Sequence, residues 1–104
     1  MQYLIVGQHP PDLCPSANET IRTLASEGGK EMPALAEKLG VKILATYVPM
    51  TNHMVFVAVE ADDANAVREF TFLGRLGQWN TVEIYQTSTL EEALTRVQEL
   101  PTIY

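Results

Sequence analysis

The chain has 104 residues, of which 46% are hydrophobic and 19% are charged, and its formal net charge at pH 7 is -6. These values are typical of a single globular domain spanning 1–104, and they exclude a disordered or fibrous chain. Only seven lysines and arginines are present, too few for the clustered phosphate contacts of a nucleic-acid-binding protein. We therefore expect no nucleic-acid partner.

The sequence also lacks the features of a membrane or exported protein. No apolar run approaches the roughly 20 residues of a membrane-spanning helix. The amino-terminal sequence MQYLIVGQ has neither a basic segment nor a cleavage pattern. We therefore expect a cytoplasmic protein without a membrane partner, in which the single cysteine, Cys14, stays a thiol that is free to react or to bind metal.

Hydrophobic periodicity and turn residues predict strands and helices in alternation. In chain order these are a strand at 2–6, a helix from about 17 that Gly28 and Gly29 break or kink and Gly40 ends, strands at 41–48 and 53–61, a helix at 62–73, a strand at 80–87 and a helix at 88–100. Capping boxes place Ser16 and Ser88 at the starts of the first and last helices.

The order βαββαβ is the ferredoxin-like pattern, and the last helix is an addition to it. Right-handed crossovers place the strands in the order 4-1-3-2, in one four-stranded antiparallel sheet of an α+β protein. The first two helices then cover one face of the sheet. Because the central strands are apolar on both faces, we expect a second subunit on the other face, in a homodimer or a higher homo-oligomer.

This topology brings the two histidines of the chain together. The first and third strands are antiparallel neighbours, so His9 at the end of one and His53 at the start of the other lie at the same end of the sheet. Cys14 lies in the next loop, just before a helix whose dipole favours a thiolate. Imidazole and thiolate groups bind late first-row ions, and three of them leave a fourth position open. We predict one transition-metal ion on His9, Cys14 and His53, with copper or nickel favoured and zinc or iron as alternatives.

Several neighbouring residues are candidates for a supporting role. Met50 and Met54 flank the second histidine, and either is a candidate axial ligand or a packing residue. Trp79 precedes the last strand and either borders the site or packs in the core. Asp12 is a candidate acceptor for an imidazole N–H, whereas Glu60 lies at the opposite end of its strand.

The stretches HPPDLCPSAN, HMVFVAVEADDANAV and WNTVEIY resemble the dimeric α+β barrel superfamily. Within it, the chain is similar to small bacterial and archaeal domains of unknown function related to the GYD and nickel-binding ferredoxin-like proteins. The resemblance covers most of residues 2–87 and implies a barrel formed by two sheets packed face to face. Members include cofactor-free monooxygenases, haem enzymes, sulfur-oxidising iron enzymes and metal binders, so no single activity is implied. This chain lacks the further histidine of a haem-type or three-histidine site.

Three functions are compatible with these features. The first is a metal-binding protein for storage, sensing or redox work. The second is an enzyme acting on a small hydrophobic molecule, oxygenase-like or sulfur-transferring, in which Tyr47, His53 and Trp79 orient the substrate and Cys14 is a nucleophile or persulfide carrier. The third is a non-catalytic assembly or sensing module, which predicts no bound metal and an unreactive cysteine.

Overall fold

A computed structural model describes all 104 residues of the chain. The strands are β1 (Gln2–Gln8), β2 (Lys42–Tyr47), β3 (Met54–Glu60) and β4 (Thr81–Thr87), and the α-helices are α1 (Glu19–Leu39), α2 (Ala64–Leu73) and α3 (Leu90–Val97). Single 3-10 turns, η1 (Pro11–Leu13) and η2 (Leu76–Gln78), lie in the loops before α1 and β4. The predicted α+β class and element order are confirmed, and the fold is compatible with a ferredoxin-like protein.

The four strands form one antiparallel sheet in the order β2-β3-β1-β4, which is the predicted order. The central pair is β1 and β3, whose ladder runs from Gln2 opposite Glu60 to Gln8 opposite Met54. The residues that follow β1 therefore emerge beside those that precede β3. Glu60 lies at the other end of the ladder, as predicted.

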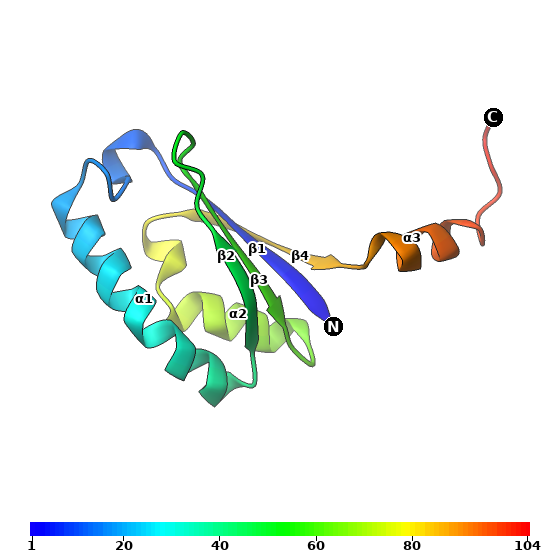
Figure 1. Cartoon of the computed structure of the whole chain (residues 1–104), viewed down its shortest axis with the longest axis horizontal. Helices are drawn as coiled ribbons and strands as arrows, with labels where there is room; N and C mark the ends of the chain where they lie inside the picture. Colours follow the sequence, from blue (N-terminus) through cyan, green and yellow to red (C-terminus); the bar gives the residue numbers. More distant parts are fainter.

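The hydrophobic core lies between the sheet and the two helices that cover one of its faces, α1 and α2 (Figure 1). Alternate residues of β1 and β3 point into it, and α2 adds two fully buried side chains. These residues are Tyr3, Ile5, Val55, Val57, Val59, Val67 and Phe70. Burial of each such side chain stabilises the folded state by about 1.5 to 3 kcal/mol. The central strands that carry the site are therefore held stably in place.

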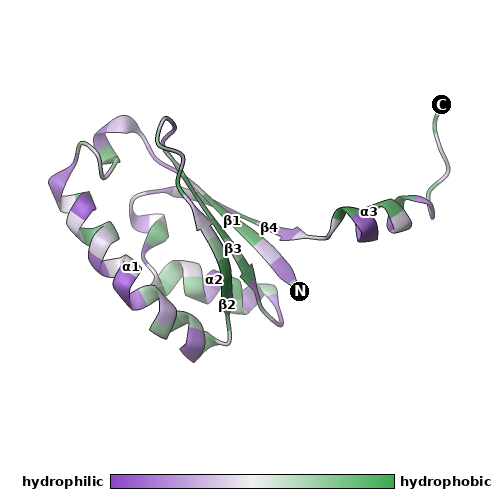
Figure 2. Cartoon of the chain, viewed as in Figure 1, coloured by the Kyte–Doolittle hydropathy of each residue, from purple (hydrophilic) through white to green (hydrophobic).

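The opposite face of the sheet carries no helix (Figure 1), and β2 and β3 are largely hydrophobic, whereas β4 also carries polar residues (Figure 2). α3 does not cover this face, because it runs away from the body of the molecule (Figure 1). Its apolar side chains, Leu90, Leu94 and Val97, are exposed. None of the helices combines the length and hydropathy that crossing a membrane requires.

Of the break or kink predicted for the first helix, the break is wrong, because α1 is continuous from Glu19 to Leu39. Glycine costs about 1 kcal/mol relative to alanine in a helix interior. Here the turns beyond Gly28 and Gly29 are held by Met32 and Leu35, which pack against the core. Gly40 ends the helix in a left-handed conformation, as predicted from its position.

The predicted helix caps are also wrong by one or two residues. The side chain of Asn18, not Ser16, accepts the hydrogen bond of the N-terminal turn of α1, at 3.0 Å. Thr89, not Ser88, does so for α3, at 3.1 Å. Because α1 does not use its hydroxyl as a cap, Ser16 is free to contact Cys14 instead.

Candidate metal centre

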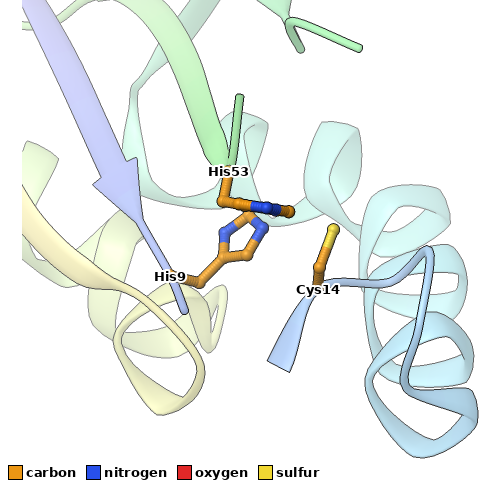
Figure 3. A group of neighbouring side chains, drawn as sticks. All are labelled: His9, Cys14 and His53. Atoms are coloured by element: carbon orange, nitrogen blue, oxygen red, sulfur yellow. The ribbon is translucent and has the colours of Figure 1, made fainter. Parts of the chain in front are cut away.

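The two histidines and the only cysteine lie together at one end of the sheet (Figure 3). His9 follows β1, His53 precedes β3, and Cys14 lies in the loop between β1 and α1. One nitrogen of each imidazole and the cysteine Sγ all lie within 4.8 Å of one another. The structure thus brings together the three residues that the sequence singled out.

The backbone fixes the two histidines relative to each other. The amide of His9 donates to the carbonyl oxygen of His53 at 3.1 Å, which continues the β1–β3 pairing beyond the last residues of the strands. The imidazole rings are neighbours, with centroids 5.7 Å apart and planes inclined at 65°. Their proximity follows from strand pairing and needs no metal to enforce it.

The loop between β1 and α1 holds Cys14 from both sides. The Cys14 amide donates to the carbonyl of Pro11 at 3.2 Å, and its own carbonyl accepts from the amides of Ala17 and Asn18, each at 2.9 Å. Arg22 of α1 donates to two further loop carbonyls, at 2.8 and 3.0 Å. Three prolines in this loop restrict its backbone and so lower the conformational entropy that the loop loses when it becomes ordered. They are Pro10, Pro11 and Pro15.

His9 has a defined tautomer because Asn80 holds its ring. Nδ1 of His9 lies 2.8 Å from Oδ1 of Asn80. The amide nitrogen of Asn80 donates to the carbonyl of Leu76 at 3.2 Å, so the amide oxygen faces His9 and accepts from Nδ1–H. In the neutral ring, Nε2 then carries a lone pair. This Nε2 is buried and has no hydrogen-bond partner.

Close packing supports this arrangement. The indole of Trp79 lies against the imidazole of His9, with ring centroids 5.1 Å apart, so Trp79 does border the site. On the other side, a Cβ on Gly7 would lie 2.8 Å from Val55 Cγ1 and 3.1 Å from the Asn80 side chain. Glycine at position 7 therefore lets Asn80 approach β1.

Asn80 supports the site although no sequence pattern predicted that role for it. It is 8% exposed and lies directly before β4, which begins at the same end of the sheet as the histidines. A polar residue at that position was the available signal. The predicted acceptor, Asp12, is exposed and forms no side-chain hydrogen bond with either imidazole, so that prediction is wrong.

The cysteine is prepared to act as a thiolate. The Ser16 hydroxyl donates to Cys14 Sγ at 3.0 Å. This bond and a second one from the Ser16 backbone are the largest causes that lower the pKa of the Cys14 thiol to about 6, and a side-chain hydrogen bond with His53 contributes as well. Above that pH the thiolate predominates, and it is the form that binds metals.

The distances between the three ligand atoms are compatible with the binding of one ion after small side-chain movements. Zinc-type bonds of about 2.0 Å to nitrogen and 2.3 Å to sulfur place tetrahedral ligand atoms about 3.3 to 3.6 Å apart. The three atoms lie within 4.8 Å of one another, so side-chain movements of roughly 1 Å bring them into range. His53 is exposed in its loop and has room to make that movement.

A cavity of about 650 Å³ adjoins the three residues and extends between α1 and the sheet. Both candidate axial ligands, Met50 and Met54, line it, although Met50 is 95% exposed. Trp79 lines it as well. Tyr47 does not line the cavity and is 66% exposed, so its predicted role in orienting a substrate is wrong.

No protein-family model matches the chain, and no curated protein matches its sequence. The function of the site is therefore inferred from its geometry.

Proposed function

We propose that the protein binds one transition-metal ion per chain through His9, Cys14 and His53. The observation that carries the proposal is the unpaired, buried Nε2 of His9. Asn80 directs its lone pair toward the ion position by holding the opposite ring nitrogen. Metal-binding histidines are commonly oriented by such an outer hydrogen bond.

Copper or nickel is favoured over zinc and iron. Two imidazole nitrogens and one thiolate form a borderline to soft ligand set. For such sites affinity rises along the first-row series through nickel to copper. With three protein ligands, one coordination position stays open, which suits storage, sensing or redox work better than a closed structural site.

The test is elemental analysis of protein purified without a histidine tag, together with its optical spectrum. We expect close to one equivalent of metal per chain, and a thiolate-to-copper charge-transfer band if the ion is copper. Replacing His9 and His53 together by alanine should abolish binding, whereas Asp12→Ala, in the same loop region but outside the group, should retain it. Full stoichiometry in the double variant would contradict the proposal.

A second candidate function, sulfur transfer or another reaction of a small hydrophobic molecule at Cys14, is favoured by the low pKa of this thiol and the adjoining cavity. The two functions differ in how metal affects the thiol. If Cys14 is a metal ligand, loading the protein with nickel should slow its alkylation by iodoacetamide strongly. An unchanged rate in the presence of nickel would favour the thiol-based function.

The uncovered sheet face supports a homodimer of the dimeric α+β barrel type. Strand alternation places apolar, half-buried side chains on this face, and Tyr85 adds a ring that is 49% exposed. The residues are Leu4, Val6, Phe56, Ala58 and Tyr85. An exposed group of apolar side chains of this kind marks an interaction site, and a second copy brings a matching face.

Sedimentation at micromolar concentration tests the dimer. The natural chain should have twice the monomer mass, and Phe56→Glu should convert it to a monomer. Phe72→Glu is the matched control, because Phe72 is 77% exposed on α2, on the helical side of the sheet. A monomeric natural chain would contradict the proposal.

A further inference from the structure

The cavity beside the metal centre has candidate metal ligands at one end and an apolar lining in its interior. One end is formed by His9, Cys14 and His53, and the interior is lined by apolar side chains such as Met32, Val57 and Leu76. No lysine, arginine, aspartate or glutamate lines it. An ionic group in the interior would be desolvated without a charged partner, so this region suits only an apolar body.

Two glycines keep this space open. Gly28 and Gly29 lie in the middle of α1 and line the cavity together with Ala25 and Leu24, one helical turn earlier. A Cβ at either glycine would meet no atom within 4 Å, and neither has a positive φ. Neither backbone conformation nor close packing therefore explains glycine here, although each costs helix stability. The glycines do provide room beside the sheet.

We propose that this cavity binds a small, elongated apolar molecule that carries one metal-binding head group, a carboxylate or thiolate. The proposal rests on the proposed metal-binding function and names the ligand class of that site. The head group occupies the open fourth position of the ion held by His9, Cys14 and His53. The apolar body extends along α1 toward Met32. A volume of about 650 Å³ is within the range of small-molecule pockets.

Cobalt(II) substitution and decanoate as the probe provide the test. Cobalt bound by thiolate and imidazole gives absorption bands that respond to a change of the fourth ligand. We expect decanoate to shift these bands in a saturable manner. Decanol, which lacks the carboxylate, should leave them unchanged at the same concentration.

Variants of α1 separate the cavity from the metal ligands. Gly28→Leu fills the cavity, so we expect it to bind cobalt with unchanged stoichiometry and decanoate at least tenfold more weakly. Ala25→Phe, which fills the same space from the preceding turn, should behave alike and serves if Gly28→Leu does not fold. Ser26→Leu is the matched control, because Ser26 is exposed and does not line the cavity.

The outcomes distinguish this inference from the proposed function. If cobalt binds but decanoate leaves the spectrum unchanged, the ligand proposal is overturned and the metal site stands. Decanoate binding that is equally tight in both cavity-filling variants also overturns it. If the natural chain binds no cobalt, the metal site fails and the ligand site fails with it.

Discussion

The two histidines of the proposed centre are held very differently. His9 is bonded to Asn80 through one ring nitrogen and packed against Trp79, and its other nitrogen is buried. His53 is exposed, and its ring has no outer hydrogen bond like the one between His9 and Asn80. His9, on the β1 side of the site, is thus preorganised, whereas His53, on the β3 side, has room to move toward a bound ion. We expect His9 to set the position of an ion and His53 to complete its coordination.

Single ligand variants test this asymmetry most directly and should give the largest effects. His9→Ala should lower metal affinity on the order of 100-fold or more, because it removes a ligand whose orientation the fold already provides. His53→Ala should weaken binding less, because His53 is exposed and has no outer hydrogen bond that orients its ring before the ion binds. Nickel titrations of both variants give the comparison. A larger loss in His53→Ala would reverse the assignment of the rigid side.

Removing the support behind His9 should have the next largest effect. Asn80→Ala leaves Nδ1 of His9 without its acceptor and frees the ring, so metal affinity should fall about 10- to 100-fold. Loss of this part-buried hydrogen bond should also lower the free energy of unfolding by about 1 kcal/mol. Asn52→Ala, at an exposed position next to His53, is the matched control and should change neither quantity appreciably. Equal effects of the two variants would remove the distinction between the sides.

Substitutions of Gly7 and Gly28 compare close packing around the site with open space, through their effects on the free energy of unfolding. Gly7→Ala should lower the free energy of unfolding by about 1 to 3 kcal/mol, because the added methyl would clash with Val55 Cγ1 at 2.8 Å and would lie tightly against the Asn80 side chain at 3.1 Å. It should also weaken metal binding by displacing Asn80. Gly28→Ala meets no neighbouring atom and should raise the free energy of unfolding by up to about 1 kcal/mol. Denaturant unfolding of both variants measures the difference. A neutral Gly7→Ala would show that Asn80 has room to move.

The smallest effect concerns Cys14, which contacts both sides. In metal-free protein, its pKa of about 6 means that the thiolate forms as pH rises through that value, so the iodoacetamide rate should reach half its maximum near pH 6. Ser16→Ala should raise the midpoint, because the Ser16 side chain is the largest cause of the lowering. Stopped-flow alkylation across pH measures it. A midpoint near the ordinary thiol value of about 8.5 would contradict the activated thiolate.

Much of the site could be predicted because it depends on strand order. Once β1 and β3 are antiparallel neighbours, His9 and His53 must meet, and the length of the loop returns Cys14 to the same end. Asn80 could not be assigned, because its contact with His9 joins positions 71 residues apart and requires the approach that Gly7 allows. The continuity of α1 was missed for a related reason, since distant core contacts outweigh the local cost of two glycines.

The sequence by itself determined the alternation of elements, the sheet order and the meeting of the only imidazoles and thiol, because periodicity and crossover handedness leave few topologies open. Only the tertiary structure decided which ring nitrogen of His9 keeps a lone pair, and that α1 stands far enough from the sheet to leave a cavity. The tautomer of His9 and the cavity beside α1 both depend on the exact distances between side chains of different elements. Hydrophobic patterning does not encode distances at that scale.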